Sequence, residues 1–309
     1  MILVIGEILM DMIGNTAKDS LDVVGKLGGA PFNVASDLSD LNIPVCFHGV
    51  LGKDVIGDFL SDQLKEAKDN LSLSLSRRED KMTTIAFFLK DKGDFQFLRK
   101  AGADYDFKKE ELLSLPYQKA SIIHFGSLFL SDKNARETIF SAIKDYKKEK
   151  KLISFDVNFR SDIFKEGEDY LSYYKEMISL SDIIKTTTDE LEMLTGEKEL
   201  INGLKKLGEH KIILITDGKN GSYSYYHEHL YFKKSVPVKP VDTIGCGDSF
   251  MAGSLSYLYN KDIDSLKEED IDALLECGNL CGKKTCLVTG ALHAYRSIND
   301  LEDKYETDR

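Results

Sequence analysis

The hydrophobic and polar positions of the chain alternate between short apolar runs and longer stretches with helical periodicity. Buried strands are predicted at 2–5, 45–50, 121–125, 152–155, 182–185 and 212–216. Helices are predicted at 55–67, 135–147, 170–180 and 271–284. This order of strands and helices is typical of layered domains in which helices cover a largely parallel sheet. The pattern therefore predicts an α/β protein.

Two further extended runs, at 83–89 and 95–99, flank a turn-rich segment at 91–94 and are predicted to form an antiparallel hairpin. Together with residues from about 12–27, they are expected to form a small sheet outside the main one, acting as a lid over a cleft. The alternative is an edge extension of the central sheet. No repeat or low-complexity linker divides the chain, so residues 1–309 are predicted to form a single domain.

Composition and charge narrow the choice of partners. The chain has a net charge of −11, which disfavours nucleic acid and anionic membranes as partners. It lacks an apolar run of about 18 residues and a basic leader, and its five cysteines are too few and odd in number for a disulfide scaffold. A soluble protein of the reducing cytoplasm is expected. A phosphorylated ligand would need local compensation from backbone amides, a helix N-terminus or a divalent cation.

The segment D-T-I-G-C-G-D-S-F at 242–250 carries the strongest chemical signal and runs into a helix-like stretch. Gly245 and Gly247 permit tight turns, so backbone amides can face an anion at the positive end of the helix. Asp248 would repel a phosphate but could accept a proton from an attacking hydroxyl. The alternative is that Asp248 only caps the helix, because Asp is a favoured cap residue. The length of the pattern favours the base.

The pattern D-T-x-G-x-G-D-x-F resembles the C-terminal signature of the ribokinase-like, or PfkB, carbohydrate kinase family. The stretch G-G-A-P-F-N-V-A at 28–35 resembles the family's N-terminal motif in its fructokinase form. The resemblance covers essentially the whole chain. It implies a three-layer α/β/α core with a mostly parallel sheet and a β-lid, and an ATP-dependent sugar kinase. Asp248 would be the catalytic base, and the amides of Gly245, Cys246 and Gly247 would stabilise the transferred phosphoryl group.

The resemblance also implies a set of sugar contacts, which come from four motifs. These residues are Asp11 after the first strand, Gly28, Gly29 and Asn33 of the glycine-pair motif, Phe97 and Arg99 of F-x-F-x-R, and Arg160 of D-x-N-x-R. Simpler interpretations stand beside them. Asp11 alone suits a solvated turn, the glycine pair suits a helix-entry turn, and Arg160 could form a local ion pair with Asp156 or Asp162.

The nucleotide and metal contacts implied by the resemblance lie further along the chain. They are Thr216, Gly218 and Gly221 of T-x-G-x-x-G, Lys185, Asn279 of the C-terminal helix, and Glu190 for the metal. The cofactors would be ATP and Mg²⁺, and the family also allows K⁺ near the Asp242 loop. One position departs from the family pattern, because Thr187 replaces the Asn of N-x-x-E. A threonine hydroxyl replaces part of the hydrogen bonding of that amide.

Fructose is the predicted substrate, because G-G-A-P-x-N-V-A and D-x-N-x-R occur together. The reaction would convert ATP and D-fructose to ADP and fructose 6-phosphate. Ribose, 2-keto-3-deoxygluconate or a nucleoside is the alternative substrate, and a catalytically weak sugar-binding regulator is the non-enzymatic alternative. A dehydrogenase is disfavoured, because the first strand leads into Gly6-Glu7-Ile8 and not into G-x-G-x-x-G. The only expected partners are the small sugar and a second copy of the chain, bound through the lid.

Overall fold

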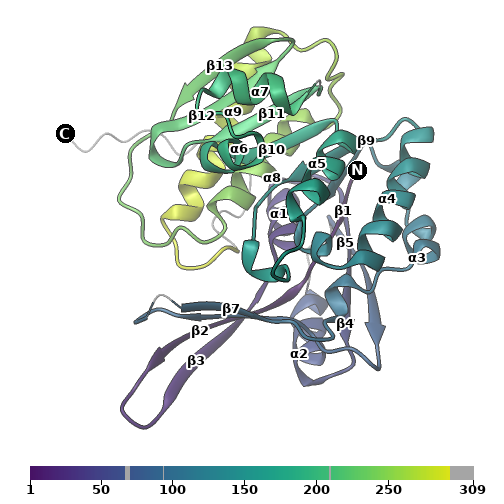
Figure 1. Cartoon of the computed structure of the whole chain (residues 1–309), viewed down its shortest axis with the longest axis vertical. Coiled ribbons are helices and arrows are strands. Elements are labelled where there is room, and N and C mark those ends of the chain that lie inside the picture. Colours follow the sequence, from purple (N-terminus) through teal and green to yellow (C-terminus); the bar gives the residue numbers. More distant parts are fainter. Residues whose placement is uncertain (67–69, 93, 209, 293–309) are drawn as a thin grey trace.

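A nine-stranded sheet forms the centre of the protein (Figure 1). The computed structural model describes residues 1–66, 70–92, 94–208 and 210–292. The strand order is β13-β12-β11-β10-β9-β8-β1-β4-β5. Neighbours from β11 to β5 pair in parallel, whereas β12 and β13 form an antiparallel edge. The strand bounds are β1 Ile2–Ile5, β4 Val45–Gly52, β5 Leu71–Arg78, β8 Ile122–Phe125, β9 Leu152–Asp156, β10 Ile183–Thr187, β11 Ile212–Thr216, β12 Gly221–Tyr226 and β13 His229–Lys234.

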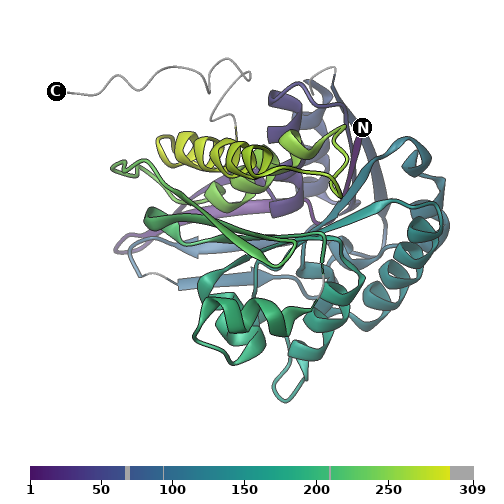
Figure 2. The ribbon, with the colours of Figure 1, turned by 90° about the horizontal axis from the view of Figure 1, so that it is seen from above.

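Helices cover both faces of this sheet (Figure 2). One face packs against α1 Ala30–Asp40, α2 Val55–Gln63, α8 Cys246–Leu258 and α9 Glu268–Cys286. The other packs against α3 Lys109–Ser114, α4 Lys133–Lys148, α5 Tyr170–Leu180, α6 Thr188–Thr195 and α7 Leu200–Leu207. Successive side chains of a strand point to opposite faces, so Ile2 and Val4 enter one core while Leu3 and Ile5 enter the other. Both faces are buried, which explains why the central strands β1, β8, β9 and β11 are largely apolar.

A second, four-stranded sheet projects from the core and is called the small sheet below (Figure 1). Its order is β3-β2-β6-β7, with β2 Leu9–Thr16, β3 Leu21–Gly28, β6 Ile85–Leu89 and β7 Asp94–Leu98. The predicted hairpin and the segment near 12–27 thus pair in one separate sheet, and the edge-extension alternative is wrong. Gly93 of the predicted turn lies outside the described residues.

The segment after β1 is fixed by close packing of three residues. A Cβ added at Gly6 or at Gly126 would lie 2.4 Å from Cγ of Pro31 in each case. Pro31 belongs to the first turn of α1, where its missing N–H costs nothing. The end of β1, the end of β8 and the start of α1 therefore meet where two glycines leave room for one proline ring.

The predicted three-layer α/β/α fold is confirmed, and the six predicted strands and four predicted helices are all present. Three strands of the main sheet, β5, β12 and β13, are additional to the prediction. Within the described ranges, none of the helices has the length and apolar character needed to cross a membrane. All five cysteines are free thiols.

Candidate active site

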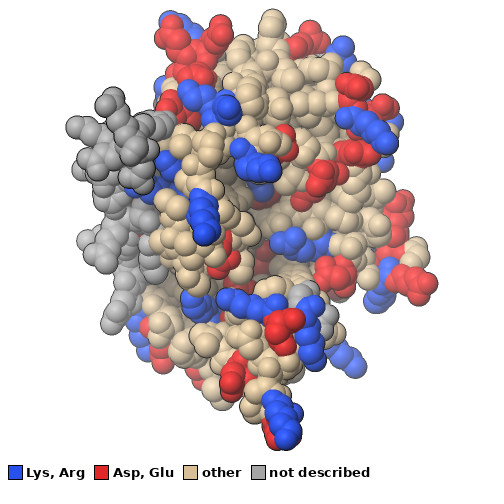
Figure 3. Space-filling view, turned by 90° about the vertical axis from the view of Figure 1, so that its left-hand side faces the viewer, with Lys and Arg blue, Asp and Glu red and all other residues tan. Residues whose placement is uncertain are grey.

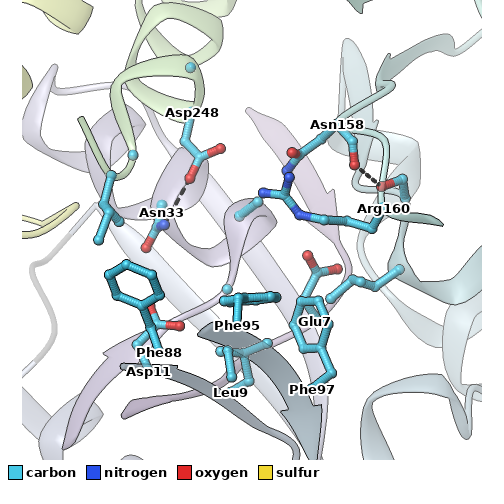
Figure 4. Close-up of a pocket in the computed structure, with 18 of the residues that line it drawn as sticks. Glu7, Leu9, Asp11, Asn33, Phe88, Phe95, Phe97, Asn158, Arg160 and Asp248 are labelled. Atoms are coloured by element: carbon cyan, nitrogen blue, oxygen red, sulfur yellow. Dashed lines mark hydrogen bonds between the residues drawn. The ribbon is translucent and has the colours of Figure 1, made fainter. Parts of the chain in front are cut away.

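A cavity of about 680 Å³ lies between the small sheet and the carboxyl ends of the central strands. It forms the hollow visible in Figure 3, and Figure 4 shows its lining side chains. In the sheet, β1 lies between β4 and β8. The strands that follow on one side of β1 are β4 and β5, and those that follow on the other side are β8, β9 and β10. Ligands of open α/β sheets bind at such a switch point, because the loops diverge there and leave a crevice.

Asp248 faces this cavity from the first turn of α8 and is only 9% exposed. Gly245 precedes the helix with φ 79°, and a Cβ there would lie 2.4 Å from Cβ of Ala291. The amide of Cys246 donates to the carbonyl of Thr243 at 3.3 Å. The first-turn amides of Gly247 and Asp248 have no intrahelical acceptor, so they are available to an anion at the positive helix end.

Asn33 contacts Asp248 directly. Its Nδ2 donates a hydrogen bond of 2.8 Å to Oδ2 of Asp248, as drawn in Figure 4. Burial raises the pKa of Asp248 above its ordinary value, while the hydrogen bond from Asn33 and the charges of Lys185 and Arg160 oppose that rise. Asn33 was predicted to contact sugar, and in the structure its amide holds the carboxylate of Asp248.

Lys185 places a positive charge beside the first turn of α8. Its Nζ lies 3.0 Å from Oδ2 of Asp156 and 3.0 Å from the position that a Cβ on Gly247 would take. Burial alone would lower the pKa of Lys185, but Asp156, Glu190 and Asp248 outweigh burial and raise it. The lysine is therefore protonated and faces the cavity where an anion would bind near Gly247.

Arg160 lines the cavity, with its guanidinium group close to Asp248 and Glu7 in the view of Figure 4. It follows β9 in a loop where Asn158 has φ 31°, and the carbonyl of Asn158 accepts a 3.0 Å hydrogen bond from Ser127. Neither Asp156 nor Asp162 is its ion-pair partner in the described part of the chain. The local ion-pair interpretation of Arg160 therefore has no support.

The small sheet supplies the apolar wall of the cavity. Phe88, Phe95 and Phe97 line it, and the rings of Phe95 and Phe97 meet edge to face at 4.8 Å. Asp11 lies on β2 and faces the same space, and burial raises its pKa to about 6. Gly28 is not itself in the lining, but a Cβ there would lie 1.9 Å from Oδ2 of Asp11. Gly28 thus makes room for the carboxylate.

Arg99, a predicted sugar contact, is not among the residues that line the cavity. Its Nε lies 2.7 Å from Oδ2 of buried Asp104, and its other nitrogens donate to Ser131 and to the carbonyl of Leu128. Leu128 itself lines the cavity. The structure therefore places Arg99 behind the wall, where its bonds hold the Leu128 segment.

Of the predicted nucleotide residues, Lys185 lines the main cavity, whereas the other four lie outside it, at the β11 to β12 connection and on α9. Thr216 ends β11, and a Cβ on Gly221 would come 2.2 Å from the carbonyl oxygen of Lys233, so the close backbone approach requires glycine. Gly218 lies between them. Asn279 lines a small separate depression between α9 and the end of β13, where its amide donates to the carbonyl of Lys233 at 3.4 Å.

Glu190, the predicted metal residue, forms a capping box with Thr187 at the start of α6. Its carboxylate accepts from the amide of Thr187 at 2.8 Å and from the amide of Phe159 at 2.7 Å. Thr187, the departure from the family pattern, thus supports the helix start through its own hydroxyl. In the described ranges, no group of three His, Cys, Asp or Glu residues forms a metal cage.

Glu7 lines the cavity and was not predicted as a site residue. It follows β1, and side chains at the carboxyl ends of parallel strands converge at the same sheet edge. The location of Glu7 directly after the first predicted strand could therefore have identified it from the sequence. Ser127 and Asn158, which follow β8 and β9 in the same way, were also missed.

A buried carboxylate and a helix N-terminus for an anion, both at a cavity beneath a separate sheet, are the features of a phosphotransferase of the ribokinase-like class. The family model for the pfkB carbohydrate kinases matches residues 1–297, and the chain belongs to this family. Probable fructokinase-7 of Arabidopsis thaliana is 32% identical to it, over 98% of this chain and 92% of the relative.

Two solved structures share this fold closely. The fructokinase of Xylella fastidiosa with bound ATP superposes with a TM-score of 0.89 at 27% identity, covering 97% of this chain and 96% of that one. A double mutant of Vibrio cholerae fructokinase, in a form with fructose, ADP and potassium ion, gives 0.88 at 25% identity, with the same coverage. The predicted family and the ribokinase-like fold are therefore confirmed.

Proposed function

We propose that this chain is a fructokinase that transfers the γ-phosphoryl group of ATP to D-fructose, giving fructose 6-phosphate. The observation that carries the proposal is the position of Asp248. It is buried at the anion-binding end of α8 and opens onto the same cavity as Asp11, Asn33 and Arg160. The similarity to fructokinases with bound ATP and with bound fructose and ADP supports the choice of nucleotide and sugar.

In the proposed reaction, Asp248 accepts the proton of the acceptor hydroxyl as that oxygen attacks the phosphorus atom. The amides of Gly245, Cys246 and Gly247, together with Lys185, would stabilise charge on the transferred group. The amide of Cys246 would first have to leave the carbonyl of Thr243. Asp11, Asn33 and Arg160 would hold the sugar hydroxyls, and Phe97 would cover an apolar face of the sugar. Arg99 would act through the Leu128 segment.

The nucleotide would extend from Lys185 and Gly247 along Thr216, Gly218 and Gly221 toward Asn279. Mg²⁺ would neutralise charge on its phosphates when bound. The described residues form no three-ligand cage, which fits an ion held mainly by the phosphates and water. Glu190 already accepts two backbone hydrogen bonds, so we propose that it orients metal-bound water. A K⁺ ion near the Asp242 loop stays part of the proposal, because the Vibrio cholerae structure contains potassium.

We also propose that residues 1–309 act as one cytoplasmic catalytic domain and that the small sheet is a lid. Leu21, Val24 and Leu98 on this sheet are each about half exposed or more, at 48%, 61% and 48%. Exposed apolar surface of this kind favours a homodimer through the small sheet. Sedimentation of the purified chain should give a dimer, and Val24→Lys should shift it to monomer. A wild-type monomer at micromolar concentration would contradict this assembly.

The substrate is tested with purified chain, ATP and Mg²⁺ against fructose, ribose, 2-keto-3-deoxygluconate and a nucleoside. Fructose should give the highest kcat/KM, with fructose 6-phosphate as product by chromatography. A much faster reaction with ribose or 2-keto-3-deoxygluconate would overturn the fructokinase assignment. Negligible turnover with tight sugar binding would favour a sugar-binding regulator.

A further inference from the structure

Glu7 is a buried carboxyl group that the mechanism above does not use. It is 4% exposed and lines the cavity, so its accessible surface faces the space where a sugar would lie. In Figure 4 its carboxyl group points into the cavity, next to Phe97 and Arg160. A carboxyl group so placed, with its free surface turned into the cavity, is available to a hydrogen-bonding group of a ligand.

The position of Glu7 is fixed by glycines on two neighbouring segments. A Cβ at Gly29 would lie 2.5 Å from the main-chain oxygen of Glu7, and a Cβ at Gly126 would lie 3.2 Å from its Oε2. The main chain is thus held against the start of α1 and the side chain against the end of β8. Glu7 therefore presents its carboxyl group in a pre-organised direction, as specific recognition of a ligand requires.

The charges around Glu7 leave it without an ion-pair partner. Besides burial, its own backbone amide, Asp104, Arg99 and Asp248 act on it, and the amide and Arg99 favour its charged form. Arg99 already pairs with Asp104 at 2.7 Å, and no other lysine or arginine in the described ranges pairs with Glu7. Burial raises the pKa of Glu7 to about 8. A protonated carboxyl group both donates and accepts, as a sugar hydroxyl does.

We propose that Glu7 is a specificity-determining residue that exchanges hydrogen bonds with a sugar hydroxyl other than the phosphoryl acceptor. This inference rests on the proposed function and names one contact within it. The acceptor hydroxyl lies at Asp248, so the hydroxyls on the remaining carbons must find other partners in the closed cavity. A sugar that lacks the hydroxyl facing Glu7 would leave this buried carboxyl group with its own backbone amide as partner and no ligand partner, and a site built around such a pair rejects that sugar.

The test compares the apolar variants Glu7→Leu and Glu7→Met with Glu7→Gln. The Gln variant is the matched control, because its amide both donates and accepts. Leu and Met should raise KM for fructose about 10- to 100-fold, while kcat changes less and KM for ATP stays constant. Gln should keep KM for fructose within about threefold of wild type. Melting temperatures identify any variant that fails to fold.

A set of monodeoxy fructoses locates the hydroxyl. For one analogue, the wild type should discriminate against the missing hydroxyl about 10- to 100-fold, and Glu7→Leu should lose that discrimination. Equal KM for fructose in wild type and both apolar variants would overturn the proposal. If the wild type phosphorylates no fructose, the proposed function fails separately. Calorimetric sugar binding without ATP then decides on Glu7: weaker binding by Leu but not by Gln supports the contact, and no binding by wild type overturns it.

Discussion

The side-chain amide of Asn33 is hydrogen bonded to the carboxylate of Asp248 across 215 positions of the sequence. The bond joins α1 to α8 and brings together the G-G-A-P-F-N-V-A and D-T-x-G-x-G-D-x-F motifs, which the sequence shows only as separate patterns. One amide thus connects the sugar side of the cavity to the proposed base. The first prediction concerns this bond.

Replacing Asn33 by Leu removes the hydrogen bond at similar volume. The bond from Asn33 opposes the rise that burial causes in the pKa of Asp248, so its loss should raise that pKa further. A base must be deprotonated, so the acid limb of kcat/KM against pH should move to higher pH, and the plateau should fall at least about tenfold. An unchanged acid limb in a folded variant would show that Asn33 does not act on the base.

Asp248→Asn should lower turnover by at least about 10²-fold, because an amide cannot accept the proton of the attacking hydroxyl. Its oxygen still accepts from Asn33, so the variant should fold and bind the sugar as the wild type does. Steady-state kinetics and calorimetry measure the two properties. Turnover within tenfold of wild type would refute the role of Asp248 as base.

Glu7→Gln should change the pH dependence of stability. The pKa of Glu7 is about 8 in the folded chain against 4.5 ordinarily, so the folded state keeps a proton that the unfolded state has lost between these values. The wild type therefore loses stability as pH rises from about 4.5 to about 8. The Gln variant does not, because an amide does not titrate in this range. In urea unfolding at about pH 9, the free energy of unfolding of the variant should exceed that of the wild type by roughly 2 to 5 kcal/mol. Near pH 4 the two free energies should be equal. If the difference in unfolding free energy between variant and wild type did not depend on pH, the raised pKa of Glu7 would be contradicted.

Arg99→Met should mainly destabilise the fold, because Asp104 would remain buried without its partner. Loss of one member of a buried ion pair costs about 3–5 kcal/mol. The measurement is chemical unfolding. A full-stability variant with a greatly raised KM for sugar would instead support the direct sugar contact predicted from the sequence.

Gly126→Ala should destabilise the protein by about 1–3 kcal/mol, because its Cβ would lie 2.4 Å from Cγ of Pro31. Pro31→Ala removes that ring atom. In a double-mutant cycle, Pro31→Ala should recover much of the cost, giving a coupling energy of at least about 1 kcal/mol. Additive effects would show that the two residues are not in close contact in solution.

The sequence predicted the apolar core elements well, because burial on both faces leaves a nearly continuous hydrophobic run. The strands at 2–5 and 212–216 and the helix at 170–180 match the structure to the residue. Edge strands are less apolar, and β12 and β13 were missed. The alternation L-S-L-S-L-S at 71–76 is a strand signal that the prediction did not include, and it lies in β5.

Residues that line the cavity were easiest to predict where one segment contains several of them, as at Gly245 to Asp248. They were harder to predict where two segments that are distant in the sequence meet. The pairing of Arg99 with Asp104 depends on the arrangement behind the cavity wall, whereas Phe97, two residues away, lines the cavity. By contrast, the spacing T-x-x-E of Thr187 and Glu190 is a capping-box signal that the sequence already contained.

Gly6, Pro31 and Gly126 come from three separate segments, yet the proline ring fits only because both neighbouring positions are glycine. In a mutational scan, alanine at positions 6 and 126 should be poorly tolerated in each case. Alanine at 31 should relieve the contact at 126, whereas at position 6 the Cβ of residue 31 would still lie 2.8 Å away, so relief there needs glycine at 31. The three positions would then display epistasis. Substitutions at positions 6 and 126, beside the sugar cavity, would be tolerated only together with a substitution at position 31.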